Sequence, residues 1–179
     1  MHAARQGDVQ KALELLRECT VDDTDSCRCT ALMYAATYGH VSIAEALVDR
    51  EADVNAQSHD KWTPLIAAVY NGHMHMADFL VSKGADIEFA DERGWTALMH
   101  VAFNGRLDIL RSLLQCGARV ERCDKEGRSA LVYAAFRNHA DIVKCLLDAG
   151  AALSGHEGEG AAGLALMFAA DKAGVLSSA

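Results

Sequence analysis

The apolar residues of this chain recur in an eleven-residue block that returns every 33 residues. The four blocks are TALMYAATYGH from Thr30, TPLIAAVYNGH from Thr63, TALMHVAFNGR from Thr96 and SALVYAAFRNH from Ser129. In each block a leucine is followed three and four residues later by small apolar side chains, which is the spacing of one helix face. The pattern therefore predicts short helices over residues 31–37, 64–70, 97–103 and 130–136.

The second block shows how each helix begins and ends. Thr63 is suited to cap a helix, and Pro64 suits the first helical position, where no N–H is needed. Gly72 is suited to end the helix. A further apolar stripe around Leu80 predicts a second helix that stops at Gly84, after which the polar stretch ADIEFADERGW returns to the next block. Each copy is thus predicted to be a helix pair followed by an extended turn.

A helix pair of this size cannot bury its apolar face alone, so the copies must stack. The predicted fold class is all-α, an α/α solenoid with short β-hairpin loops, formed as a single domain over residues 1–179. Complete copies are expected at residues 25–57, 58–90, 91–123 and 124–156, with partial copies at 1–24 and 157–179. The first partial copy is one residue out of phase. We expect the repeat array to be cut at its ends and to fray first over residues 154–179. We also expect a monomer, or a weak dimer that forms through the uncapped ends.

The 33-residue period and the stretches TPLIAAVYNGH, GADIEFADERGWTALMHVAFNG and ADVNAQ resemble ankyrin repeats. The resemblance implies that partners bind on the concave side, which hairpin tips and first helices line. The histidine that the family has after Thr-Pro-Leu is replaced by Met33, Ile66, Met99 and Val132. We therefore expect its hydrogen bonds to be lost in favour of apolar packing. Glu51 and Asn138 occupy positions where other copies have glycine, and we expect less favourable turns there.

Three repeated positions on the expected binding side carry aromatic, charged and asparagine side chains, and two of the three form aromatic columns. Core packing favours the same residue in every copy, whereas these positions vary, and their composition is typical of a protein-binding hot spot. The alternative is that the aromatic side chains only pack against neighbouring copies. The predicted partner-binding residues are Tyr38, Trp62, Tyr70, Asn71, Glu92, Arg93, Trp95, Phe103, Asn104, Arg128, Phe136 and Arg137.

Composition and charge narrow the classes of partner. The chain is 51% hydrophobic with one proline, which favours an ordered, helical protein. Its net charge is −8, of which residues 1–90 contribute −7, and this argues against binding to nucleic acid. No apolar run approaches the roughly 20 residues that cross a membrane, and the N-terminus does not resemble a signal peptide. We expect a cytoplasmic protein that binds another protein and neither nucleic acid nor membrane.

Candidate chemistry is sparse. The CRC motif of Cys27 and Cys29, with Cys19 nearby, lacks the second ligand pair of a structural zinc site, so we expect reduced thiols and no metal. His40, His73 and His139 share one position of the copy, which favours a structural role. There is no phosphate-binding loop, nucleophile elbow or His-Glu-x-x-His motif. We therefore expect no catalytic residues, no cofactor and no enzymatic activity.

Two alternatives stay open. Asn55 resembles the ankyrin asparagine that a hydroxylase modifies in some animal proteins, or it is simply a hairpin-turn asparagine. The favoured function is a non-catalytic protein–protein interaction module or scaffold that binds through its concave face. The TALM motif is also similar to the sequence of ankyrin arrays that follow NIMA-related kinase domains. The alternative is therefore that the chain is a docking or regulatory region of a larger enzyme of that type.

Overall fold

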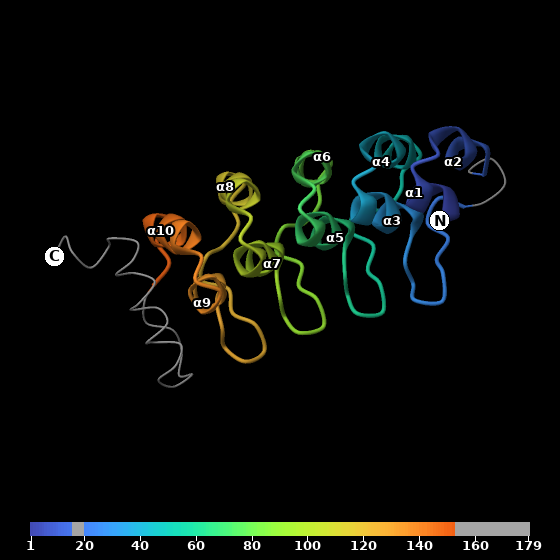
Figure 1. Ribbon diagram of the computed structural model, residues 1–179. Coiled ribbons are helices and arrows are strands. Elements are labelled where there is room, and N and C mark those ends of the chain that lie inside the picture. Colours follow the sequence, from blue (N-terminus) through green and yellow to red (C-terminus); the bar gives the residue numbers. More distant parts are fainter. Residues whose placement is uncertain (16–19, 153–179) are drawn as a thin grey trace. The chain divides into compact units, whose positions relative to one another are not determined.

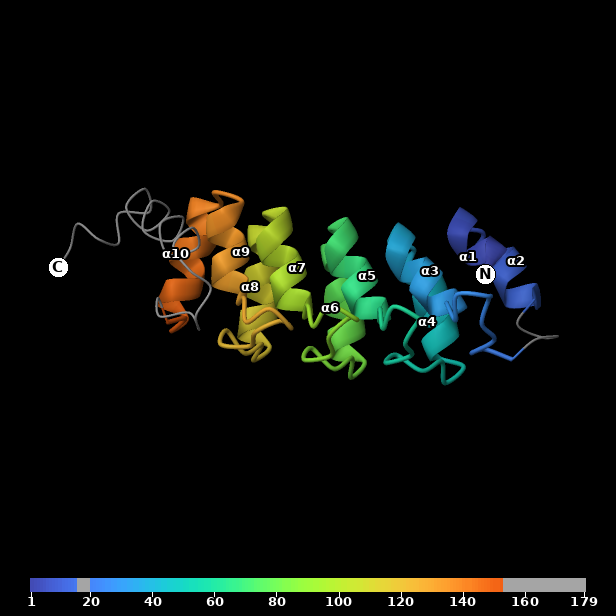
Figure 2. The same cartoon turned by 90° about the horizontal axis from the view of Figure 1, so that it is seen from below.

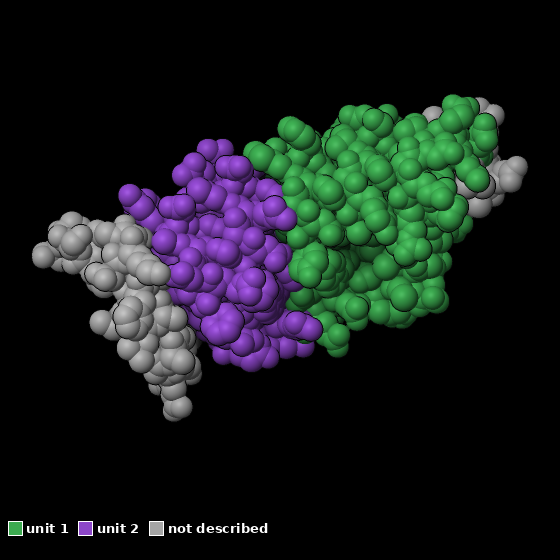
Figure 3. Space-filling view, in the orientation of Figure 1, with its two compact units in different colours: residues 1–92 green, residues 93–179 purple. Residues whose placement is uncertain are grey.

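The computed structural model describes residues 1–15 and 20–152. The described residues contain ten helices, and the chain divides into two compact units, Met1–Glu92 and Arg93–Ala179, whose described parts Figure 3 colours separately. The expectations for Cys19, for the partial copy at 157–179 and for fraying over 154–179 fall outside the described residues.

Unit 1 consists of two layers of helices. The helices are α1 (His2–Gln6), α2 (Val9–Leu15), α3 (Ala31–Tyr38), α4 (Val41–Val48), α5 (Pro64–Asn71) and α6 (Met74–Ser82). The first helices α1, α3 and α5 lie side by side in one layer, and α2, α4 and α6 form the other (Figures 1 and 2). The loop between α4 and α5 extends away from both layers (Figure 1). This is the predicted helix-pair stack.

Unit 2 repeats the arrangement with four helices, α7 (Ala97–Asn104), α8 (Leu107–Gln115), α9 (Ala130–Phe136) and α10 (Ala140–Asp148). Here α7 packs on α9, and α8 packs on α10. The positions of α3, α5, α7 and α9 confirm the four predicted first helices. Within the described residues no strand forms, and isolated antiparallel bridges pair Thr24 with Thr30 and Cys123 with Ser129 at the base of two hairpin loops.

The ends of α5 illustrate why these segments are helical. The side chain of Thr63 accepts a hydrogen bond from the backbone N–H of Ile66 at 3.2 Å, which satisfies one donor that the first turn leaves unpaired. Pro64 occupies the first turn, where its fixed φ suits a helix. The helix ends at Gly72, whose φ of 81° is left-handed.

Within each unit, the core is made of columns that repeat from copy to copy. Buried columns of the first helices are Leu32, Leu65, Leu98 and Leu131; Ala35, Ala68, Val101 and Ala134; and Ala36, Val69, Ala102 and Ala135. The second helices bury Ile43, Met76, Ile109 and Ile142; Ala44, Ala77, Leu110 and Val143; and Leu47, Leu80, Leu113 and Leu146. Burying one leucine or isoleucine side chain contributes about 1.5–3 kcal/mol, so these columns supply most of the folding energy. Phe79, which belongs to the apolar stripe of α6, is only half-buried.

The histidines after the first helices join one copy to the next. His73 Nε2 lies 3.0 Å from the carbonyl oxygen of Thr37, 36 residues earlier, and His139 Nε2 lies 3.2 Å from that of Phe103 at the same separation. His40 Nε2 lies 3.3 Å from the carbonyl oxygen of Arg5, at a separation of 35. These contacts confirm the structural role of the histidines and the one-residue phase shift of the first partial copy.

A second set of bonds joins successive loops at separations of 29 or 31 residues. Asn55 Oδ1 accepts from the backbone N–H of Asp86 at 2.8 Å, and Asn55 Nδ2 donates to the carbonyl oxygen of Gly84 at 3.3 Å. At the equivalent positions of other copies, the Asp22 carboxylate accepts from the N–H of Asp53, and the Glu121 carboxylate accepts from that of Ala152. Asn55 therefore takes part in a bond that acidic residues form elsewhere, which supports the hairpin-turn interpretation.

Several non-glycine residues adopt left-handed backbone angles. Glu51 has φ 65° and Asn138 has φ 59°, which confirms that both take the conformation of the glycines they replace. Arg28 and Lys61, at the tips of two hairpin loops, each have φ 59°. A left-handed conformation costs an ordinary L-residue roughly 1–2 kcal/mol, so the stack must hold these turns in place.

Candidate functional site

The predicted partner-binding residues of unit 1 lie on its first helices and hairpin loops. Tyr38 and Tyr70 are 46% and 45% exposed. Asn71 and Glu92 are also exposed, and Trp62 is half-buried. These five residues are called the unit 1 face below.

The structure brings only part of the unit 1 face together. The rings of Trp62 and Tyr70 meet edge to face with centroids 5.1 Å apart, which is a favourable aromatic geometry. Tyr38 instead stacks on His40 with centroids 6.2 Å apart. The Trp62–Tyr70 pair is therefore the aromatic centre of this face, and Tyr38 belongs to the adjoining helix turn.

The predicted residues of unit 2 surround a larger aromatic cluster. Trp95 and Phe103, both half-buried, have ring centroids 5.3 Å apart. Both also contact Tyr133 of the next first helix, at 4.1 Å and 6.0 Å. The guanidinium carbon of Arg137 lies 4.7 Å from the Phe103 ring centroid, within cation–π range. The aromatic side chains thus pack between copies and still present part of their surface.

The remaining residues lie around this cluster. Phe136 is 72% exposed, Arg93 and Arg128 are exposed, and Asn104 is half-buried. The guanidinium of Arg128 lies over the Tyr133 ring and forms ion pairs with Asp124 at 3.1 Å and Glu126 at 2.5 Å. The unit 2 face comprises Arg93, Trp95, Phe103, Asn104, Arg128, Phe136 and Arg137.

Behind the unit 2 face lies a polar interaction that the sequence analysis missed. The Asp124 carboxylate accepts hydrogen bonds from the backbone N–H groups of Glu126 and Arg128 at 3.0 and 2.8 Å, from Arg128 Nε at 3.1 Å, and from the Tyr133 hydroxyl. Burial works to raise the pKa of Asp124, but these hydrogen bonds outweigh it and the pKa is lowered. Burial also raises the pKa of Tyr133, and the bond to Asp124 adds to the effect.

The first copy contains the same arrangement. Asp25 accepts from the N–H groups of Cys27 and Cys29 at 2.8 and 2.9 Å and from the Tyr34 hydroxyl at 2.6 Å. The sequence analysis did not predict these bonds, which lie beside the apolar packing expected where Met33 replaces the family histidine. The buried Met33 replaces the histidine, while the next residue, Tyr34, bonds the hairpin aspartate instead. The signal was the nine-residue spacing of Asp and Tyr in both copies.

Unit 1 has a groove between its hairpin loops and first helices. Its volume is about 160 Å³, and it is lined by Cys29, Met33, Thr37, Ser58, Asp60, Trp62, Thr63 and Ala67. Trp62, a residue of the unit 1 face, forms part of its wall. Burial raises the pKa of the Cys29 thiol, and the negative charges of Asp25 and Asp60 add to the shift, so this thiol is neutral at physiological pH. The groove combines apolar, aromatic and acidic groups.

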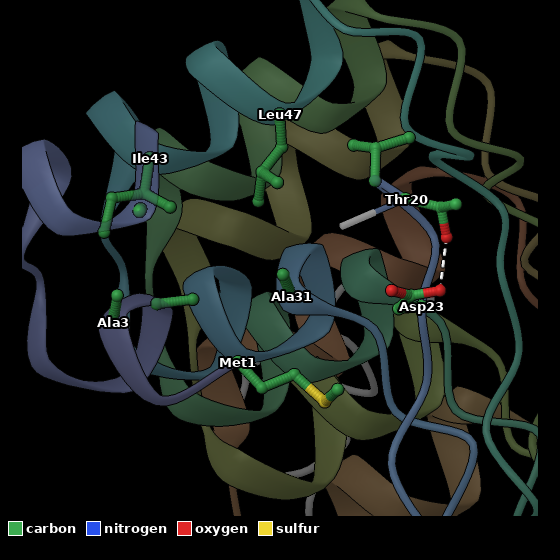
Figure 4. A pocket seen from close by; sticks show the side chains of 10 residues that line it. Met1, Ala3, Thr20, Asp23, Ala31, Ile43 and Leu47 are labelled. Carbon is green, nitrogen blue, oxygen red and sulfur yellow. Dashed lines mark hydrogen bonds between the residues drawn. The ribbon is translucent and has the colours of Figure 1, made fainter. Parts of the chain in front are cut away.

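A second hollow in unit 1 lies between α1, α3 and α4 (Figure 4). Its volume is about 140 Å³, and most of its lining is apolar, including Ala3, Ala31, Ile43 and Leu47. The polar side chains beside it, Thr20 and Asp23, are hydrogen-bonded to each other. Ligand pockets typically measure about 300–1,000 Å³ and present a few convergent polar groups, so this hollow does not fit that description.

Candidate chemistry in the described residues is limited to isolated groups. Cys27, Cys29, Cys116, Cys123 and Cys145 carry unpaired thiols. Within residues 1–15 and 20–152, no group of three or more His, Cys, Asp or Glu side chains is placed to hold a metal ion. None of the helices in the described part of the chain is long and apolar enough to cross a membrane.

Comparison with known proteins identifies the repeats. A family model described as ankyrin repeats (three copies) matches residues 1–91 and again residues 86–156. A search of curated proteins finds no matching relative.

Proposed function

Since the chain belongs to the ankyrin repeat family, whose fold is generally a non-catalytic protein-interaction module, we propose that it is a scaffold that binds a partner protein. Binding takes place through the side formed by hairpin loops and first helices, the concave side of an ankyrin stack. The unit 1 face and the unit 2 face are the contact residues. The exposure of Phe136, at 72%, is the observation that best supports this proposal.

An exposed phenylalanine on a first helix is unfavourable unless it is covered by something. Phe136 adjoins Arg137, and Arg137 packs over Phe103, so an aromatic–cationic surface extends from the helix end. Aromatic residues and arginine are the side chains enriched at the energetic centres of protein interfaces. Tyr70 and Trp62 provide a comparable exposed pair in unit 1. The unpaired thiols of the described cysteines support a site of action in the cytoplasm, where thiols stay reduced.

The proposal is tested by selecting partners on the full chain. A display library of natural protein segments is panned on the immobilised chain, and recovered segments are measured by calorimetry. We expect Tyr70→Ala to lower the affinity of a segment that binds the unit 1 face, and Phe136→Ala that of a segment that binds the unit 2 face, by about tenfold or more, since hot-spot truncations cost about 2 kcal/mol.

The matched controls are Glu45→Ala on α4 and Arg111→Ala on α8, both exposed on second helices. These variants should leave the affinity within about twofold. The proposed faces would be contradicted if the control variants lost as much affinity. They would also be contradicted if the affinity of the recovered segments depended on neither Tyr70 nor Phe136.

A further inference from the structure

The groove of unit 1 has the shape and chemistry to receive one side chain from a partner. Its lining comes from two consecutive copies, since Cys29 and Asp60 belong to neighbouring hairpin loops. The loops are held together by a hydrogen bond from the N–H of His59 to the carbonyl oxygen of Cys27 at 3.0 Å. The side chain of Ser58 accepts from the N–H of Trp62 at 3.1 Å and fixes the base of the second loop. The groove is therefore a built feature of the hairpin stack.

The walls of the groove are apolar and aromatic. Met33 and Ala67 are buried at its base, and Trp62 is held in place by its edge-to-face contact with Tyr70. The hydroxyl of Thr37 already donates to the carbonyl oxygen of Met33 at 2.8 Å. An aliphatic stem followed by a cation can lie along such walls, because the stem covers apolar surface and the cation meets the face of an indole.

The acidic group of the groove is the side chain of Asp60. Among the described residues, no ion pair or side-chain hydrogen bond engages the Asp60 carboxylate, and Arg28 and Lys61, the cations of the same hairpin tips, do not pair with it. The backbone of Asp60 is nevertheless fixed, because its carbonyl oxygen accepts from the N–H of Glu92 at 3.0 Å. A carboxylate held at the mouth of an aromatic groove is positioned to receive a positive charge.

The charge of unit 1 favours the same ligand. Residues 1–92 carry 16 acidic and 7 basic side chains, a formal charge of −9. Residues 93–179 carry 9 and 10, a formal charge of +1. A cationic segment is therefore attracted to unit 1 before any specific contact forms.

We propose that the groove lined by Cys29, Asp60 and Trp62 binds an arginine or lysine side chain of the partner segment. The stem packs on Met33 and Ala67, the cation lies against the Trp62 ring, and Asp60 supplies the counter-charge. This inference rests on the proposed function and adds the chemistry of the partner: an extended segment with at least one basic residue.

The test uses the full chain and three capped glycine–serine pentapeptides whose central residue is arginine, lysine or norleucine. One readout is the indole N–H resonance of Trp62, assigned with a Trp62→Phe variant. The other is the alkylation rate of Cys29. Trypsin cuts after Arg28, so Cys27 and Cys29 fall on separate peptides and Cys27, which is exposed, is an internal control.

We expect the arginine and lysine peptides to shift the Trp62 resonance and to slow alkylation of Cys29 at least threefold, with Cys27 unchanged. Asp60→Asn should weaken the peptide affinity at least fivefold, whereas Glu45→Gln, which removes an equal charge from α4, should change it less than twofold. Thermal melts of both variants establish that the fold is intact.

Several results would overturn the inference. These are equal binding of the norleucine peptide, equal losses from Asp60→Asn and Glu45→Gln, or no response to either basic peptide. Protection of Cys29 by rising protein concentration alone would make a second copy of the chain the occupant. A further outcome is that the affinity of segments recovered by display depends on Tyr70 or Phe136 but not on Asp60. That result would support the proposed interaction module and contradict the binding of a basic side chain in the groove.

Discussion

The hydroxyl of Tyr34 donates a 2.6 Å hydrogen bond to the carboxylate of Asp25, nine residues earlier in the chain. The bond fastens the base of a hairpin loop to the first helix that follows it. Tyr133 and Asp124 form the same bond in the fourth copy. The loop of Asp25 carries Cys29, which lines the groove, and the loop of Asp124 carries Arg128 of the unit 2 face. The two bonds therefore link the packing of the repeats to the placement of the proposed binding residues.

Removing the tyrosine hydroxyl should loosen the loop without disturbing the aromatic packing. Tyr133 is 5% exposed, and its partner carboxylate is charged, so Tyr133→Phe should lower the free energy of unfolding by about 1.5–3 kcal/mol in urea denaturation. Tyr34→Phe should cost less, since Tyr34 is only half-buried. Tyr38→Phe is the control, because Tyr38 is exposed and its described contact is through the ring. An equal loss in all three variants would contradict a specific role for the Asp–Tyr bond.

The Asp25–Tyr34 bond should also make stability depend on pH. The hydrogen bond from Tyr34, followed by that from the N–H of Cys29, holds the pKa of Asp25 below the ordinary value of 3.8. A lowered folded-state pKa stabilises the fold above the unfolded-state pKa, and this stabilisation disappears as the pH falls through the folded-state pKa. The stability difference between the wild-type chain and Asp25→Asn should therefore be constant near neutrality and shrink below about pH 4. A difference that stays constant in acid would contradict this.

The same bond predicts that the phenol of Tyr34 loses its proton at a higher pH than an ordinary tyrosine. The hydrogen bond that the Tyr34 hydroxyl donates to Asp25 is the main reason that the pKa of Tyr34 rises from 10.0 to about 12. Subtracting the ultraviolet titration of Tyr34→Phe from that of the wild-type chain should give a phenolate that forms near pH 12. A difference spectrum centred near pH 10 would show that the hydroxyl is not held by the carboxylate.

The fold could be predicted from the sequence because it depends on repeated local signals. A leucine with small residues three and four positions later places α3, α5, α7 and α9, and a threonine before the helix and a glycine after it mark the ends of α3, α5 and α7. The Asp–Tyr bonds were not predicted because each joins a loop to a helix, so it lies outside the local signals of a single helix. The groove at Asp60 was missed for a related reason: its walls come from two copies, and no single copy contains it.

The left-handed non-glycine residues offer a route to greater stability. Glu51 has φ 65°, and Glu51→Gly should raise the free energy of unfolding by about 0.5–1 kcal/mol, because glycine adopts this conformation without steric cost. Asn138→Gly should gain less, since asparagine tolerates positive φ better than most residues. The reverse control is Gly84→Ala at the equivalent position of the next copy. A Cβ at Gly84 meets nothing within 4 Å. The loss of stability in Gly84→Ala, about 1 kcal/mol, therefore measures the cost of the left-handed backbone alone. A destabilised Glu51→Gly variant would show that the glutamate side chain contributes more than its strain.

Phe136 and Trp95 should separate binding from stability in unit 2. Trp95 contacts Phe103 and the buried Tyr133, so Trp95→Ala should lower the free energy of unfolding by about 2 kcal/mol as well as weaken the partner. Phe136 is 72% exposed, and Phe136→Ala should change stability by less than about 0.5 kcal/mol while it lowers the affinity of a display-selected segment about tenfold. Urea denaturation and calorimetry on the same preparations measure both effects. Undiminished affinity in Phe136→Ala would remove this residue from the binding face, and a large loss of stability would mean that its ring is packed and not presented to a partner.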